Sequence, residues 1–152
     1  MKFVGEAGAY DVYFSLIDAS FYMEEHTEEA EYTGTLTFDD KAKRTTFNSN
    51  QQVWQENGIT LTNDKAASTN AVADYAKPAR FYKGSNVKIE APGAIVSISI
   101  NVSGLESKYV TAWGTASNGI VTITLDGTSN TYQFTNLSAQ ARANSITVTY
   151  VK

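Results

Sequence analysis

Strict alternation of apolar and polar residues is the feature that most constrains how this chain can fold. Between residues 95 and 103, Val96, Ile98, Ile100 and Val102 occupy alternate positions, and serine or asparagine fills the positions between them. A period of two is typical of a β-strand with one buried face. The same alternation recurs at residues 32–38, 87–91, 121–126 and 145–150, and in weaker form at 59–61, 80–82 and 132–134. The sequence therefore predicts an all-β protein.

Residue pairs that favour tight turns separate these runs. Asn57-Gly58 and Asn118-Gly119 suit the positive φ angles of a two-residue hairpin turn. Short strands at this spacing predict a two-sheet antiparallel β-sandwich with a jelly-roll-like arrangement. Helical turns are expected only near residues 49–55 and 138–143.

The length of 152 residues suits one domain with its own core, so we expect a single β-sandwich domain over residues 1–152. Residues 1–33 stand apart within it as an N-terminal extension. The stretch from Val12 to Tyr22 is apolar and aromatic, which suits a strand that covers a sheet edge, and the acidic run from Glu24 to Glu31 suits a solvated loop. The same strand could join the chain to a protein partner or to a second copy.

Charge and composition exclude several classes of partner. The net charge is −4, and the 12 lysines and arginines are scattered, whereas a nucleic-acid binder needs a basic stripe. No apolar run approaches the roughly 20 residues of a membrane-spanning helix, and the first residues lack the apolar run of a signal peptide. The chain has no cysteine, which excludes disulfides, thiolate metal sites and cysteine nucleophiles. We expect neither nucleic acid nor membrane as a partner.

Motifs for catalysis and for cofactors are missing from the sequence. The single histidine, His26, lies in the acidic run, which leaves no base for a Ser-His-Asp triad, and no phosphate-binding loop is present. Asp39-Asp40 and Asn63-Asp64 could offer oxygen ligands to a structural calcium ion, but their spacing matches no calcium motif. The sequence predicts a protein that is not an enzyme and has no cofactor.

The segment 44–93 carries the most distinctive motifs. They are Trp54 ahead of Asn57-Gly58-Ile59, the run Arg80-Phe81-Tyr82 and, later in the chain, the closing run Ser-Ile-Thr-Val-Thr at 145–149. Over residues 38–150 this order resembles β-sandwich modules appended to surface and secreted multidomain proteins of gut bacteria, and related phage proteins. The resemblance implies a jelly-roll-like fold and a non-catalytic, glycan-binding role, without defining a ligand site. It implies an extracellular or cell-surface location or, for a phage relative, the virion.

Aromatic residues are the first candidates for a sugar site, because flat rings stack against the apolar faces of pyranoses. The candidate ligand-binding residues are Trp54 and Trp113, completed by Tyr75, Arg80, Tyr82 and Tyr109. For Trp54 the alternative is a place in the core, where large aromatic residues usually lie. Arg80 could instead pair with a carboxylate such as Asp64 or Asp74.

Two functions from different classes follow from the sequence. The first is a non-catalytic module that binds a polysaccharide or glycan on a cell-surface or secreted protein. The second is a structural component of a virion or surface assembly, such as a capsid decoration, fibre or tail protein, or an adhesion subunit.

Overall fold

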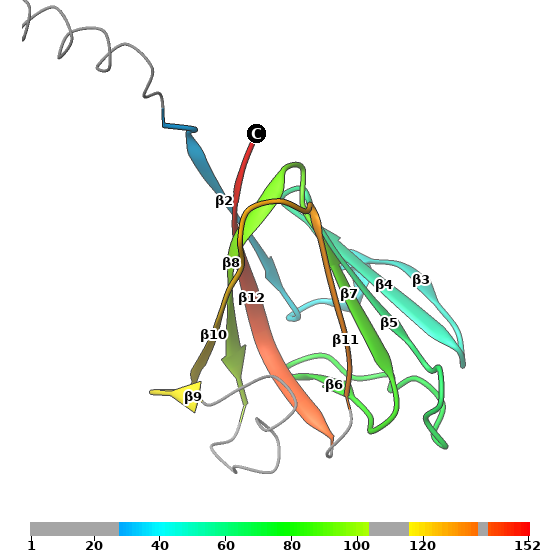
Figure 1. Cartoon of the computed structure of the whole chain (residues 1–152). Coiled ribbons are helices and arrows are strands. Elements are labelled where there is room, and N and C mark those ends of the chain that lie inside the picture. The colour runs from blue at the N-terminus through cyan, green and yellow to red at the C-terminus, as the bar shows by residue number, and fades with distance from the viewer. Residues whose placement is uncertain (1–27, 104–115, 137–139) are drawn as a thin grey trace, which may run out of the picture.

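The computed structural model describes residues 28–103, 116–136 and 140–152, and within these ranges the chain is mostly β-strand (Figure 1). The strands are β2 (Glu31–Thr37), β3 (Arg44–Phe47), β4 (Gln51–Glu56), β5 (Ile59–Asp64), β6 (Ala79–Phe81), β7 (Asn86–Glu90), β8 (Ala94–Val102), β9 (Ala116–Ser117), β10 (Ile120–Thr124), β11 (Thr131–Thr135) and β12 (Ala141–Val151). Among the described residues, the only helix is the 3-10 turn η1 (Lys41–Lys43). The prediction of an all-β chain is confirmed.

The strands form two antiparallel sheets that pack face to face. One sheet has the order β2-β12-β8-β10-β9. The short strand β6 pairs with the first residues of β12, on the same side of β12 as β2. The other sheet has the order β11-β7-β5-β4-β3. The chain crosses between the sheets at each step from β5 to β8 and again from β10 to β12, as in jelly-roll arrangements. The predicted two-sheet antiparallel β-sandwich is confirmed.

Both Asn-Gly pairs form the tight turns that the sequence predicts. Asn57 and Gly58 have φ angles of 52° and 79° between β4 and β5, and Asn118 and Gly119 have φ angles of 51° and 79° between β9 and β10. A turn with two consecutive positive φ angles matches the twist of the strands that it joins. These turns therefore set the register of both hairpins.

The two predicted helical turns are wrong where the structure describes them. Residues 51–55 lie in β4, and residues 141–143 begin β12, whereas residues 137–139 lie outside the described ranges. In β4 the inward-facing Gln52 is fully buried although it is polar, and in β12 the inward-facing Ala141 and Ala143 are small. The apolar alternation was therefore hidden at both places.

A β-bulge corrects the predicted buried face of β8. Ser97 pairs with Thr149, but Ile95 pairs with Tyr150, so Val96 is an extra residue on β8. The bulge reverses the alternation, because one inserted residue exchanges the two faces of a strand. As a result Ile95 is buried and Val96 is only half-buried, whereas the predicted burial of Ile98, Ile100 and Val102 is confirmed.

Three aromatic rings join the two sheets at the centre of the core. Phe38, which follows β2, lies edge-on to Trp54 of β4, with ring centroids 5.1 Å apart, and to Phe81 of β6, with centroids 5.9 Å apart. All three side chains are fully buried. Such edge-to-face pairs add to the large hydrophobic contribution of the rings themselves. The side chains around them are mostly aliphatic: Leu36, Ile59, Leu61, Ile89, Ile98, Ile100, Ile146 and Val148.

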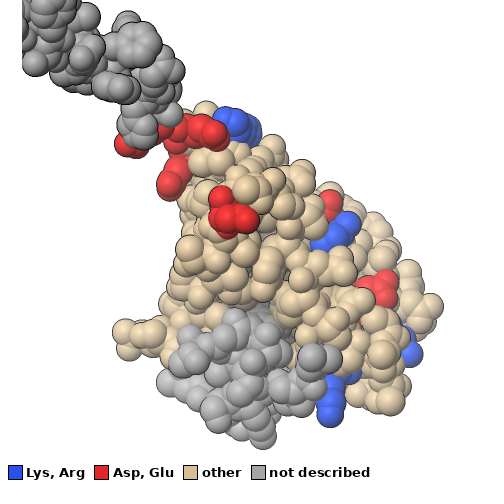
Figure 2. Space-filling model, viewed as in Figure 1, with Lys and Arg blue, Asp and Glu red and all other residues tan. Residues whose placement is uncertain are grey.

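The acidic run of the N-terminal segment continues into the first described strand. Glu28, Glu29 and Glu31 are exposed, and Glu31 is the first residue of β2, so the run is not entirely a loop. Residue 31 pairs with Val151 of β12, and Figure 2 shows acidic side chains gathered at this end of the molecule. Residues 1–27, which hold the predicted strand Val12 to Tyr22 and His26, lie outside the described ranges.

Glu56, at the end of β4, joins the two sheets on the side where β2 lies. Its carboxylate accepts hydrogen bonds from the backbone N–H and the hydroxyl of Thr37, at 2.8 and 2.9 Å, and lies 2.6 Å from Lys43 Nζ. Lys43 also pairs with Asp39 at 2.6 Å. The Lys43 ammonium, and after it the Thr37 N–H, lower the pKa of Glu56. This carboxylate is therefore ionised at neutral pH and stabilises the contact between the sheets.

Replacing Glu56 tests that contact. We expect Glu56→Gln to lower the free energy of unfolding at pH 7 by about 1 kcal/mol, because it removes a charged acceptor from two hydrogen bonds and an ion pair. A carboxyl whose pKa is lowered by folding contributes its stability above the unfolded pKa of about 4.3 and loses it as the pH falls through the folded value. The difference between wild type and variant should therefore shrink below about pH 4.

Urea denaturation at pH 7 and pH 3 measures both effects. The control is Glu90→Gln, which breaks an exposed ion pair with Lys88 and should change the free energy of unfolding by less than about 0.5 kcal/mol. A wild-type advantage over Glu56→Gln that grows on acidification would contradict the assignment.

Candidate functional site

Trp54 is not part of a sugar-stacking surface, which corrects one of the candidate site residues. Its exposed fraction is 0%, because it lies on the inward face of β4 against Phe38. A ring without an exposed face cannot stack on a pyranose. The alternative reading of the sequence, a tryptophan in the core, is the one that the structure supports.

The structure brings two of the other candidates together. The guanidinium carbon of Arg80 lies 3.7 Å from the centroid of the Tyr75 ring, and Tyr75 is 44% exposed. Arg80 therefore covers part of a ring that, among the described members of this set, is the most open to solvent. Tyr82 follows β6 and is half-buried. Tyr109 and Trp113 lie outside the described residues.

The carboxylates considered for Arg80 and for calcium have other contacts. Asp74 lies 3.0 Å from Lys41 Nζ and 2.9 Å from an Arg44 guanidinium nitrogen, and these two cations lower its pKa in that order. Asp40 caps η1 by accepting a hydrogen bond from the Ala42 N–H at 2.8 Å. Within residues 28–103, 116–136 and 140–152, no three histidine, aspartate or glutamate side chains gather closely enough to hold a metal ion.

Asn63 and Asp64 are divided between the two faces of β5. Asn63 is 1% exposed and points into the core, whereas Asp64 lies on the outer face. Alternate side chains of a strand point in opposite directions, so the two cannot chelate one ion together. Asp64 is instead part of a different group of residues.

The outer face of the five-stranded sheet is almost entirely polar. Its outward positions form three rows across β11, β7, β5 and β4, because cross-strand partners lie side by side. The rows are Thr131, Glu90, Thr60 and Gln55; then Gln133, Lys88, Thr62 and Val53; then Thr135, Asn86, Asp64 and Gln51. Val53 is the only apolar member, so this face presents hydrogen-bonding groups rather than an apolar surface.

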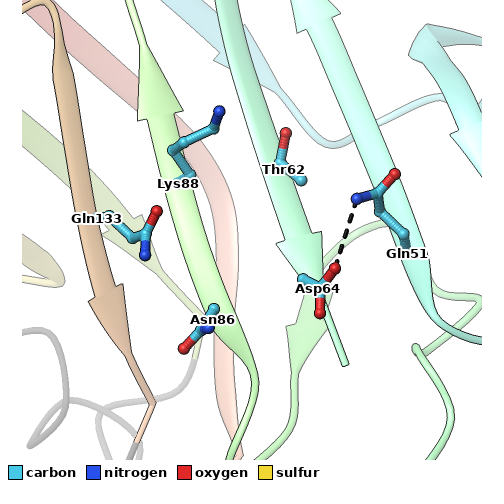
Figure 3. A pocket seen from close by; sticks show the side chains of 6 residues that line it. All are labelled: Gln51, Thr62, Asp64, Asn86, Lys88 and Gln133. Atoms are coloured by element: carbon cyan, nitrogen blue, oxygen red, sulfur yellow. Dashed lines mark hydrogen bonds between the residues drawn. The ribbon is translucent and has the colours of Figure 1, made fainter. Parts of the chain in front are cut away.

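An open hollow of about 270 Å³ lies over the second and third rows (Figure 3). We call it the polar hollow. It is lined by Gln51, Thr62, Asp64, Asn86, Lys88 and Gln133, which come from all four of these strands. The regular backbone of the sheet positions these side chains, so the hollow is built on rigid elements rather than on loops.

Hydrogen bonds and an ion pair orient the groups in and beside the polar hollow. Gln51 Nε2 donates to Asp64 Oδ2 at 3.5 Å, and the Thr135 hydroxyl donates to Asn86 Oδ1 at 2.6 Å. Lys88 Nζ lies 2.9 Å from a carboxylate oxygen of Glu90, at the rim. The hollow therefore offers amide, hydroxyl and carboxylate groups, with its one cation neutralised by a neighbour.

This composition limits the chemistry that the polar hollow can carry out. Glycoside hydrolysis by the common mechanisms needs two carboxylates across the scissile bond, and Asp64 is the only carboxylate among the lining residues. Most sites for drug-sized molecules or cofactors have apolar walls. The outward positions of β4, β5, β7 and β11 hold no aromatic ring, so this face does not resemble such a site. The arrangement is suited to binding a hydrated, hydroxyl-rich ligand by hydrogen bonds.

The polar hollow could not be found from the sequence. Its residues are glutamine, asparagine, threonine, aspartate and lysine at outward strand positions, and they form no motif. Alternation predicts that such residues point outward, but it does not predict that β4, β5, β7 and β11 are neighbours. The aromatic candidates Trp54, Tyr75 and Tyr82 are not among its lining residues.

No family model, curated protein or solved structure matches this chain. In the described ranges, no helix is long and apolar enough to cross a membrane.

The burial of Trp54 can be tested by its fluorescence. We expect the Trp113→Phe variant, in which Trp54 is the only indole, to emit at short wavelength and to resist acrylamide quenching, because the ring is enclosed by the core. Soluble polysaccharides should leave this emission unchanged. Efficient quenching of the variant in its folded state would show that Trp54 is accessible and would contradict the structure.

Proposed function

We propose that this chain is a non-catalytic binding module that holds a neutral polysaccharide on the outer face of β4, β5, β7 and β11. The observation that carries the proposal is the polar hollow, which gathers hydrogen-bonding side chains from all four strands on an open, rigid surface. An open surface accepts a segment within a long chain, whereas a closed pocket accepts only a chain end or a small molecule.

The dimensions of this face suit an extended ligand. Neighbouring strands lie about 4.8 Å apart, so the distance from β4 to β11 is roughly 14 Å. A polymer that runs across the strands would follow a single row and meet its side chains in turn, for example Gln51, Asp64 and Asn86. Sugar hydroxyls both donate and accept hydrogen bonds, and the amide and hydroxyl groups of these rows do the same.

Charge favours a neutral polysaccharide over an acidic one. The polar hollow holds one cation, Lys88, and one anion, Asp64, and Lys88 is already paired with Glu90 at 2.9 Å. An acidic polymer would lack a cationic partner here and would meet a chain whose net charge is −4. Neutral hydroxyl groups carry no such penalty.

Binding at this face should be weak for a single module. Each hydrogen bond to a sugar replaces hydrogen bonds to water, so its net contribution is only about 1 kcal/mol, and the outward positions of these strands hold no ring to add stacking. Weak modules become effective when several are linked or assembled along one polymer. We expect such a module to act where it encounters polysaccharides, which is outside the cell, on the cell surface or on a virion.

A bulky substitution in the centre of the polar hollow tests the proposal. We expect Thr62→Arg to fill the hollow and to lower the affinity for its polysaccharide at least tenfold, equivalent to about 1.4 kcal/mol. The matched control is Thr122→Arg, which places the same side chain at an outward threonine of β10 on the other sheet and should leave affinity unchanged. Both positions are on sheet surfaces, so both variants should fold.

Affinity gel electrophoresis with β-glucan, xyloglucan, galactomannan and polygalacturonate measures the effect. The proposal predicts that at least one of the three neutral polymers retards the wild type and Thr122→Arg more than Thr62→Arg. Equal retardation of the two variants, retardation by polygalacturonate alone, or no retardation by any of the polymers would contradict it.

A further inference from the structure

The outer edge of β11 exposes a row of backbone hydrogen-bonding groups. The Ala91 N–H donates to the Asn130 carbonyl at 3.0 Å, and the Asn136 N–H donates to the Ser85 carbonyl at 2.8 Å, so even-numbered residues on this strand bond to β7. Bonding alternates along an antiparallel strand, and the backbone groups of Thr131, Gln133 and Thr135 therefore point away from β7. Those of Thr131 bond to the Ser129 hydroxyl, which accepts from the Thr131 N–H at 3.1 Å and donates to the Thr131 carbonyl at 3.0 Å, so the open groups are those of Gln133 and Thr135. Among the described residues, β11 pairs with no strand other than β7.

β11 lacks the features that usually protect an edge strand from pairing. Its sequence, Thr-Tyr-Gln-Phe-Thr, has no charge and no proline, and its five pairs with β7 run without a bulge. Natural edge strands are commonly protected by lysine, proline, bulges or very short length. A flat and uncharged edge is therefore open to another β-strand.

Three other edge strands in the described part of the chain, β2, β3 and β9, are protected or very short. β3 contains a register shift after Arg44, and β9 has only two residues. On β2, side chains occupy the outer backbone groups: Asn57 Nδ2 donates to the Thr35 carbonyl at 2.8 Å, and Glu56 accepts from the Thr37 N–H at 2.8 Å. On β11 a side chain occupies the outer backbone groups only at its first residue, Thr131, through the Ser129 hydroxyl, and the central Gln133 keeps both of its outer groups open among the described residues.

The sequence of β11 is complementary to itself. An antiparallel strand centred on Gln133 would place Gln133 opposite Gln133, Thr131 opposite Thr135 and Tyr132 opposite Phe134, so that every pair joins side chains of the same kind. No like charges meet, and threonine and aromatic pairs are favourable across strands. The backbone groups that point away from β7 belong to residues 131, 133 and 135, so the Gln133–Gln133 pair and each Thr131–Thr135 pair would exchange two hydrogen bonds. At Thr131 these bonds would replace those to the Ser129 hydroxyl.

We infer that β11 is a homodimer interface, in which two copies of this chain pair their β11 strands around a two-fold axis at Gln133. A two-fold interface uses the same surface on both subunits, and a self-complementary edge meets this condition. Tyr132 and Phe134 are partly buried on the inner side of the strand, with ring centroids 5.8 Å apart. Pairing covers these rings further and adds hydrophobic stabilisation to the backbone hydrogen bonds.

The dimer would join the two polar faces. Gln133 is the β11 member of the polar hollow and lies at the axis, so the two hollows would face the same side of one continuous sheet. A polysaccharide could then contact both. This consequence rests on the proposed function, whereas the pairing of β11 does not.

A cysteine at the axis tests the pairing directly, because the chain has no cysteine of its own. Cα atoms in a hydrogen-bonded antiparallel pair are about 5.5 Å apart, within the range of a disulfide. We expect Gln133→Cys to form a disulfide-linked dimer under mild oxidation, at about ten times the yield of the control Thr62→Cys, because pairing raises the effective concentration of the two thiols. Thr62 lies on the same face of the sheet but in its middle strand.

Charge substitutions at the same position provide a second measurement that does not depend on oxidation. Residue 133 is opposite itself, so Gln133→Lys and Gln133→Glu should each be monomeric in analytical ultracentrifugation, and a mixture of the two should dimerise again. Restored dimerisation in the mixture requires the pairing that we infer, because neither variant can form it alone.

Two results would overturn the inference. One is equal and low cross-linking of Gln133→Cys and Thr62→Cys at millimolar protein. The other is a monomer whose Gln133 and Thr135 amides resist hydrogen exchange, since this would show that another part of the same chain covers the edge. Neither result depends on whether the polar hollow binds a polysaccharide.

Discussion

The contact of Phe38 with both Trp54 and Phe81 is the interaction on which the rest of this structure depends. Trp54 belongs to one sheet and Phe81 to the other, and Phe38 meets both edge-on at 5.1 and 5.9 Å. Because these rings occupy the inner faces, the alternating residues of the same strands must face solvent. The alternation that places apolar residues of β4, β5, β7 and β11 in the core therefore also places their polar residues in rows on the outer face.

The same alternation explains how much could be predicted from the sequence. Most of the strands, the two Asn-Gly turns and the sandwich follow from local patterns and agree with the structure, whereas β3 was not predicted and β4 and the start of β12 were expected to be helical turns. The bulge at Val96 could not be predicted, because it depends on pairing with β12, which is distant in the sequence. Gln52 is fully buried although it is polar, so the pattern fails there as well.

The candidate site was harder to predict for a related reason. Trp54 was a reasonable candidate for sugar binding because of its chemistry, but its side of β4 is the inner one. The polar hollow depends on strand order, which brings residues 51, 64, 86 and 133 together from four strands, and no single segment carries that information. Local sequence thus predicts the chemistry of a side chain more readily than it predicts which side chains will be its neighbours in the fold.

The two proposals meet at β11. Its outward side chains complete the polar face, and its backbone edge is the surface inferred to pair with a second copy. A pairing edge is also what a structural subunit of a virion or surface assembly requires, so self-association and polysaccharide binding are compatible within one module. Both proposals rest on a sandwich that places its apolar residues inside and has a regular, uncharged strand, β11, at a sheet edge.

An NMR titration with a soluble neutral polysaccharide tests the central claim most directly. The side-chain amides of Gln51, Asn86 and Gln133 report on the polar hollow, and the side-chain amide of Asn144, which donates to Asn101 at 2.9 Å on the other sheet, reports on the rest of the surface. We predict concentration-dependent shifts at the three amides of the polar hollow and none at Asn144. Shifts confined to the other sheet, or no shifts with any neutral polysaccharide, would contradict the account.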